Sequence, residues 1–205
     1  MDVHELAPGL WYWLAPHPAW NPEENWPEGV LCAYYEAPDA TVLFDPLVPR
    51  GEEDEFWRAL DADVERVGLP VRVLLTAPWH DRDTNLVVER YGADVWAHPG
   101  ALWKGPVLTT TDQLPSGVET FLPDGNDEGQ AFFFIREHQT LVTGDMFSGT
   151  GGRFHVFVSE EPNRAAFLVS LTRLLTLPIE RVLIAHGEPV VSDGATRIRE
   201  ALESA

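Results

Sequence analysis

Two successive sets of strand-like segments, each interleaved with helical ones, constrain the fold of this chain more than any other sequence feature. Runs of β-branched and aromatic residues bounded by Pro, Gly, Asn and Asp are typical of strands. The first set predicts strands over residues 10–14, 30–35, 41–45, 71–76 and 94–98 and helices over 52–68 and 84–92. The second set predicts strands over 118–122, 130–135, 140–145 and 181–187 and helices over 159–178 and 194–204. This repetition favours two sheets packed face to face with helices outside, as one of several arrangements that the pattern allows.

The helix predicted over 159–178 carries the signals of a helix start. Ser159 can cap the N-terminus, and Pro162 suits the first turn, where a backbone N–H would have no helical partner. Phe167, Leu171 and Leu174 recur at helical spacing, which predicts that this face of the helix packs against a sheet.

The length and the net charge limit the kinds of protein that this chain can be. The 205 residues suit a single domain spanning 1–205, since no repeat, low-complexity tract or linker-like run divides them. Fourteen Lys and Arg against 33 Asp and Glu give a net charge of −19, which repels nucleic acid and anionic membrane surfaces. We therefore expect a small-molecule substrate or ligand, and neither nucleic acid nor membrane as a partner.

The cysteine content and the apolar runs predict the compartment. Cys32 is the one cysteine and lies in the apolar run VLCAYY, which is typical of a small buried side chain rather than a reactive thiol. The N-terminus shows no basic region followed by an apolar core, and no apolar run approaches the roughly 18 residues of a membrane span. These features predict a soluble cytoplasmic protein.

Polar clusters follow three of the predicted strands. They are W79-H80-D81-R82-D83, then G144-D145, and finally H186-G187. Polar residues just beyond buried strands are where α/β folds gather ligands, because rigid strands aim side chains that loops alone cannot hold. The three clusters together predict a functional site.

In their order, these motifs resemble those of the metallo-β-lactamase fold superfamily. That family's pattern is a buried strand ending in Thr-His-x-His-x-Asp-His, a later Gly-His, a strand ending in Gly-Asp and a last strand ending in His-Gly. The corresponding segments here are VLLTAPWHDRD, LPDGNDEGQAFFF, LVTGDMF and VLIAHGEP, with an earlier strand ending in FDP. The resemblance covers most of the chain and implies an α/β fold, an αββα sandwich of two mixed sheets with helices outside.

The metal ligands that the resemblance implies are only partly present. The three His of the family's first metal site map to Ala77, Trp79 and Asn126, which do not form a plausible ligand set. The second site maps to Asp81, Arg82, Asp145 and His186, so that Asp81, Asp145 and His186 survive as metal ligands. Two carboxylates and one imidazole suit a single Zn, Mn or Fe ion.

Arg82 leaves three alternatives open. Between Asp81 and Asp145, its guanidinium would supply the positive charge that these carboxylates otherwise need from a metal, and the pocket would hold no metal. In the second alternative a single ion remains. In the third, the loop shifts so that His80 joins Asp145 and His186.

The candidate site residues support two functions. As catalytic residues, His186 or His80 could act as the general base for a water molecule and Arg82 could stabilise an oxyanion beside Asp81 and Asp145. By resemblance, Trp20, Trp26, Trp79 and Asn126 would border the substrate pocket. The chain is thus predicted to hydrolyse a small ester, thioester or lactone with at most one metal. The alternative is a non-catalytic, metal-free member that binds a small ligand or a protein partner.

Overall fold

The computed structural model describes residues 1–109, 111–125, 129–157 and 164–205. The larger of its two main sheets has the strand order β1-β2-β3-β4-β5-β6. These strands are β1 (Asp2–Ala7), β2 (Leu10–Pro16), β3 (Gly29–Ala37), β4 (Ala40–Phe44), β5 (Val71–Leu74) and β6 (Asp94–Trp96). The first four are antiparallel, and β5 and β6 continue the sheet parallel to β4.

The smaller main sheet has the order β12-β9-β8-β7, with β12 parallel to β9 and the other pairs antiparallel. Its strands are β7 (Val118–Phe121), β8 (Phe132–Ile135), β9 (Thr140–Val142) and β12 (Arg181–Leu183). A separate short hairpin joins β10 (Phe147–Ser148) to β11 (His155–Val156).

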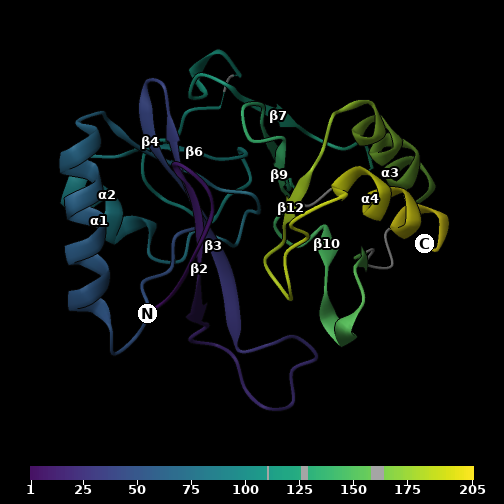
Figure 1. Cartoon of the computed structure of the whole chain (residues 1–205), viewed down its shortest axis with the longest axis horizontal. Helices are drawn as coiled ribbons and strands as arrows, with labels where there is room; N and C mark the ends of the chain where they lie inside the picture. The colour runs from purple at the N-terminus through teal and green to yellow at the C-terminus, as the bar shows by residue number, and fades with distance from the viewer. Residues whose placement is uncertain (110, 126–128, 158–163) are drawn as a thin grey trace.

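Helices cover the outer faces of both sheets. They are α1 (Glu53–Val67), α2 (Thr84–Tyr91), α3 (Arg164–Leu171) and α4 (Gly194–Glu203), and the 3-10 turns are η1 (Thr111–Gln113), η2 (Thr150–Gly152) and η3 (Thr172–Thr176). In Figure 1, α1 and α2 lie on one flank, α3 and α4 on the other, and the two main sheets lie between them. The structure therefore has the predicted αββα order of layers.

Side-chain alternation along the strands builds three apolar layers. On β8, Phe133 and Ile135 point into the layer between the sheets, whereas Phe132 and Phe134 point toward α3 and α4. Successive side chains of a strand face opposite sides of a sheet, so a continuous apolar run fills two cores at once. A third core lies between the larger sheet and α1, which buries Phe56.

Several predicted strands are shorter in the structure; for example, the strands predicted over 140–145 and 181–187 end at Val142 and Leu183. Two other differences are larger. Strand β1 was not expected, because its residues are mostly polar and exposed and it pairs with β2 alone. The helix predicted over 159–178 is described from Arg164, ends as an α-helix at Leu171 and continues as the 3-10 turn η3. The predicted helix start at Ser159 and Pro162 lies outside the described residues.

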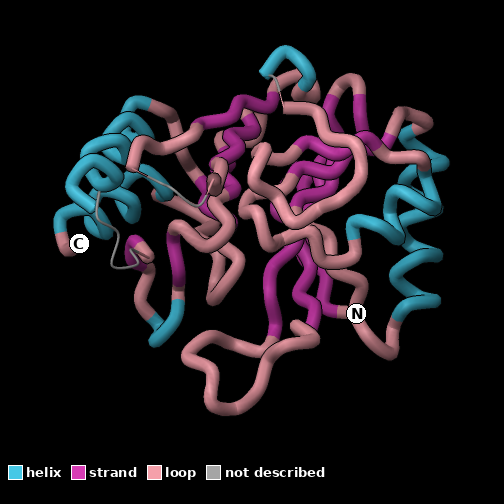
Figure 2. Tube along the Cα trace, turned by 180° about the vertical axis from the view of Figure 1, so that it is seen from behind, coloured by secondary structure: helices cyan, strands magenta, loops and turns pink. Residues whose placement is uncertain are grey.

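Four strand ends meet at one end of the sandwich. The parallel neighbours β4 and β5 lead into Asp45 and the 76–83 loop, and the parallel neighbours β9 and β12 lead into Asp145 and His186. A backbone hydrogen bond of 3.0 Å from Leu31 N–H to Ala185 C=O links the two sheets there. Because parallel strands end at the same edge, four chemically active segments converge. The loop between β2 and β3 extends beyond the sheets (Figure 2).

Among the described residues, no helix is both long and apolar enough to cross a bilayer.

Candidate functional site

The site is built on Asp45, directly after β4. This residue is buried and has a left-handed backbone, with φ of 47°. Its carboxylate accepts the backbone N–H of Thr76 at 2.8 Å and also accepts the Thr76 hydroxyl. Two parallel strand ends are thus joined by one buried carboxylate, which has no water to solvate it and requires these donors.

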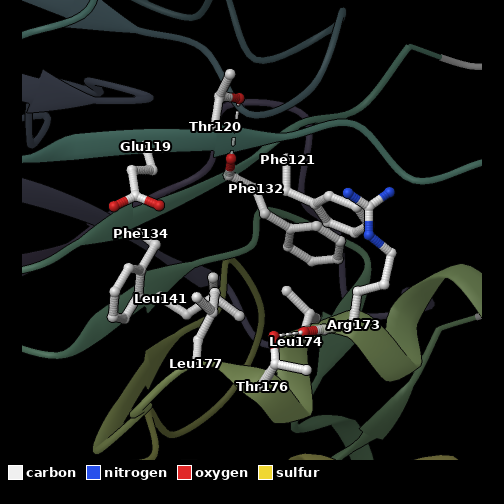
Figure 3. A pocket seen from close by; sticks show the side chains of 10 residues that line it. All are labelled: Glu119, Thr120, Phe121, Phe132, Phe134, Leu141, Arg173, Leu174, Thr176 and Leu177. Carbon is white, nitrogen blue, oxygen red and sulfur yellow. Dashed lines mark hydrogen bonds between the residues drawn. The ribbon is translucent and has the colours of Figure 1, made fainter.

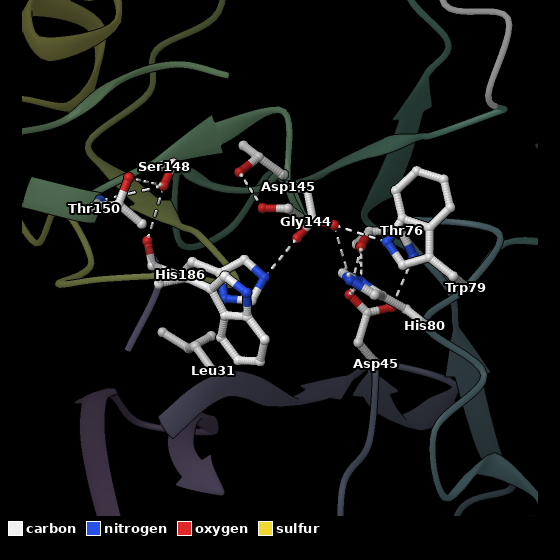
Figure 4. Close-up of polar contacts among 12 residues, drawn as sticks. Leu31, Asp45, Thr76, Trp79, His80, Gly144, Asp145, Ser148, Thr150 and His186 are labelled. Carbon is white, nitrogen blue, oxygen red and sulfur yellow. Dashed lines mark hydrogen bonds and ion pairs between the residues drawn. The ribbon is translucent and has the colours of Figure 1, made fainter. Parts of the chain in front are cut away.

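His80 lies between two carboxylates, as Figure 4 shows. Its Nδ1 is 2.9 Å from Asp45 Oδ2, and its Nε2 is 3.3 Å from Asp145 Oδ2. Ionised carboxylates only accept hydrogen bonds, so an imidazolium, which has a proton on both ring nitrogens, complements both partners. The side chain is 5% exposed. A buried cation therefore stands between two buried anions.

The charges around His80 agree with that protonation state. Burial lowers the pKa of His80, but the Asp145 and Asp45 carboxylates raise it by more, and the resulting pKa is about 9. Burial likewise raises the pKa of Asp145, but His80 and the hydrogen bond from His186 hold it well below its usual range. At neutral pH the cluster therefore contains a protonated His80 and an ionised Asp145.

Side chains from two segments, the 76–83 loop and the end of β12, approach the carboxylate of Asp145. Trp79 Nε1–H donates to its Oδ2 at 2.8 Å, beside His80. His186 Nε2 lies 3.3 Å from its Oδ1. The indole of Trp79 thus occupies a position next to Asp145 and satisfies part of its charge.

Arg82 does not occupy the place expected for it. Its Nη1 donates to the backbone carbonyl of Asp45 at 2.9 Å and approaches that of Leu31 at 3.4 Å. In the described part of the chain it makes no ion pair with Asp81 or Asp145, so the alternative of an arginine bridging these carboxylates is corrected. The physical reason is that its guanidinium is held by the backbone carbonyls of Asp45 and Leu31, at the ends of β4 and β3 that face this loop.

The residues near Asp145 do not fit a metal ion. Within the described ranges, no three His, Cys, Asp or Glu side chains are grouped to hold one. Ala77 has no donor atom, Trp79 can only donate, and both nitrogens of His80 face carboxylates. The carboxylate of Asp81 makes no hydrogen bond or ion pair with Asp145 or His186 in this part of the chain. Asn126, the remaining expected site residue, lies outside the described residues.

A pocket of about 200 Å³ opens beside His186. Its lining consists of Asn25, Trp26, Asp145, Ser148, Thr150, Phe157 and His186. The rings of Trp26 and His186 are 4.8 Å apart. Trp20 supports this wall indirectly, because its Nε1 donates to the backbone carbonyl of Trp26 at 2.9 Å.

The structure brings together several of the site residues that the sequence predicted. Asp145, His186, His80 and Trp79 form one cluster, and Trp26 borders it. Asp45 and Thr76 were not expected as site residues. The signal for Asp45 was the early strand ending in FDP, which was treated only as an agreement with the family pattern.

Solved structures identify the architecture. A metallo-β-lactamase from Pontibacter korlensis superposes with a TM-score of 0.71 at 13% identity, covering 100% of this chain and 99% of that one. A β-lactamase domain protein from Burkholderia ambifaria superposes with a TM-score of 0.66 at 20% identity, and the match covers 99% of this chain and 72% of that one. This chain has the metallo-β-lactamase fold. A metallo-β-lactamase family protein from Thermus thermophilus superposes with a TM-score of 0.63 at 18% identity, and the match covers 98% of this chain and 79% of that one. No protein-family model and no curated protein matches the sequence.

The predicted resemblance to the metallo-β-lactamase fold and the predicted αββα sandwich are both confirmed. At these identities the likeness establishes the fold and no particular reaction, because one fold carries many functions. The function must therefore be argued from the residues of the site.

Proposed function

We propose that this chain is a metal-independent member of the metallo-β-lactamase fold that binds a small ligand in the pocket beside His186. The observation that carries this proposal is the position of His80, whose two ring nitrogens face Asp45 and Asp145. A protonated imidazole supplies positive charge where the resemblance implies a metal ion. A metal ligand, by contrast, needs a free lone pair.

The pocket lining supports a small and partly aromatic ligand. Trp26 and Phe157 offer ring faces, and Ser148, Thr150 and Asn25 offer polar groups that can orient a ligand. Phe157 is 50% exposed, so that its ring is available to a ligand. We therefore expect a ligand with one flat ring and a few hydrogen-bonding atoms.

Hydrolysis of a small ester, thioester or lactone is the second candidate, and the pairing of His186 with Asp145 favours it. A carboxylate that accepts one nitrogen of an imidazole orients the ring and leaves the other as a base. In His186 that other nitrogen, Nδ1, is buried and has no hydrogen-bond partner in the described part of the chain. A water molecule reaches it only if the ring turns, so the geometry supports binding better than catalysis.

Elemental analysis of protein purified without chelators tests metal independence. We expect far less than one Zn, Mn or Fe ion per chain, because both ring nitrogens of His80 face carboxylates and neither Ala77 nor Trp79 supplies a ligand atom. One tightly bound ion per chain that is lost in a His186→Ala variant would contradict the proposal. A tenfold or larger loss of ester or thioester hydrolysis in the same variant would favour the hydrolase.

Ligand binding needs a separate measurement. A library of single-ring fragments is screened by ligand-observed NMR, and we expect the hits to lose binding in Trp26→Leu. Trp103→Leu is the matched control, because Trp103 is also partly buried but its indole donates to Pro106 C=O in another loop. Hits that bind equally to both variants would show that the pocket beside His186 is not the binding site.

A further inference from the structure

A second pocket, of about 190 Å³, lies on the outer face of the smaller main sheet, between β7, β8 and β9 on one side and η3 on the other (Figure 3). Its lining consists of Glu119, Thr120, Phe121, Phe132, Phe134, Leu141, Arg173, Leu174, Thr176 and Leu177. None of these residues belongs to the cluster around His80. The pocket is therefore a separate candidate site.

Buried apolar side chains form the base of this pocket, and polar groups lie around its rim. Phe132 and Phe134 of β8 and Leu141 of β9 form the sheet side, and Leu174 and Leu177 close it from η3 (Figure 3). An apolar cavity of about 150 Å³ lined by Leu, Ile and Phe is enough to bind benzene. This pocket consequently has room for one aromatic ring or a short acyl chain.

One cation at the pocket edge, Arg173, pairs with no carboxylate of the described residues. The guanidinium of Arg173 lies 4.8 Å from the centre of the Phe121 ring, which holds it beside the apolar floor. Over the described residues, Arg173 forms no ion pair. Its five N–H donors remain available for a planar anion in bidentate geometry.

The other polar groups of the pocket are already committed. The carboxylate of Glu119 pairs with Arg136, which compensates its charge. The hydroxyl of Thr120 donates to Phe132 C=O at 3.1 Å, and that of Thr176 donates to Arg173 C=O at 2.7 Å. A ligand therefore meets one positive charge beside an apolar surface.

We propose that this pocket binds a small organic carboxylate whose single aromatic ring or short acyl chain rests on the partly exposed side chains of Phe121 and Leu177 while its carboxylate pairs with Arg173. An organic cation would be repelled by the guanidinium. A bare inorganic anion would find one arginine and no second donor, and would leave the apolar lining unused.

The net charge of the chain decides the conditions of the test. A charge of −19 repels anions at long range, but at about 0.15 M salt the repulsion is screened beyond about 8 Å. The contact with Arg173 acts within that distance. Binding is therefore measured at physiological ionic strength.

Phenylacetate is the probe, titrated into the full chain and followed by saturable protein NMR shifts. We expect Arg173→Gln to weaken binding at least tenfold, because the exposed guanidinium supplies the one charge that meets the carboxylate. The matched control is Arg58→Gln, since Arg58 is also exposed, lies on α1 on the opposite flank and has no ion pair among the described residues. This control should bind phenylacetate like the parent.

Two further ligands test the contributions of the ring and of the carboxylate separately. Phenylacetamide keeps the ring but not the charge, and acetate keeps the charge but not the ring, so each should bind at least tenfold more weakly than phenylacetate. Absence of saturable phenylacetate binding, or equal binding to parent and Arg173→Gln, would overturn the proposal. Acetate binding as tightly as phenylacetate would also overturn it, since that result reports surface ion pairing alone.

Discussion

Replacing His80 with glutamine is expected to lower the free energy of unfolding by about 3–5 kcal/mol near neutral pH, the typical cost of removing one partner from a buried ion pair. The Asp45 and Asp145 carboxylates, 2.9 and 3.3 Å from the ring, would keep their burial and lose the cation between them. Total stabilities are typically about 5–15 kcal/mol, so this loss is a large share. Urea or thermal unfolding of parent and variant measures it.

An exposed counterpart in the same chain serves as the control for His80. His4 Nε2 lies 2.8 Å from Asp2, with side chains 45% and 60% exposed. A surface pair of this kind contributes about 0–1 kcal/mol, so His4→Gln should change stability little. A similar loss in both variants would contradict the argument, because burial is what makes the pair at His80 costly to break.

The loss should also depend on pH. Folding raises the pKa of His80 from its ordinary value of 6.5 to about 9, so its stabilisation is complete below about pH 6.5 and disappears as the pH rises through about 9. Asp145 has a lowered pKa, so its contribution is present above about pH 4 and is lost as the pH falls below that value. The gap between parent and His80→Gln should thus be widest between about pH 4 and 6.5 and narrow at higher pH. A gap that stays constant from about pH 4 to 10 would show that folding does not raise the pKa of His80.

Gly144→Ala is expected to cost about 2–5 kcal/mol, combining about 1–2 for a left-handed non-glycine residue with about 1–3 for overpacking. Gly144 has φ of 57°, and a Cβ built on it would lie 2.9 Å from Thr76 Cβ and closer still to the Thr76 hydroxyl. Thr76 cannot move away without losing both hydrogen bonds to Asp45. The variant should therefore disturb the His80 cluster as well as the stability.

Gly151→Ala isolates the steric part of this effect. Gly151 has a comparable φ of 70°, but a Cβ there meets no atom within 4 Å. Gly151→Ala should lower the free energy of unfolding only by the cost of a left-handed non-glycine residue, about 1–2 kcal/mol. Thermal melts of both variants, with the His80 ring resonances followed by NMR, measure the difference. Equal losses would mean that the close approach of Gly144 to Thr76 does not constrain the site.

The architecture follows from patterns that the sequence itself contains. The run of four apolar residues in β8 can be buried only if both faces of its sheet are covered, and the alternation places Phe133 between the sheets and Phe132 under the helices. The polar residues after β5, β9 and β12 indicated where the site would lie. Because strand order and apolar periodicity are local properties, they can be recognised without coordinates.

The sequence also predicts that the family's first metal site is incomplete. Ala77 and Trp79 lack metal-ligating atoms whatever their environment. The sequence left open whether Arg82 pairs with Asp81 and Asp145 or whether the loop shifts so that His80 joins Asp145 and His186.

Only the tertiary structure shows where Arg82 and His80 lie. Sequence spacing does not reveal that Arg82 has a left-handed backbone, nor that its guanidinium reaches the carbonyls of Asp45 and Leu31. Asp45 is 35 residues away from His80 and Asp145 is on the other sheet, yet both reach the same imidazole. The charge of that ring depends on burial and on carboxylates brought together by separate strands, and these are properties of packing rather than of residue order.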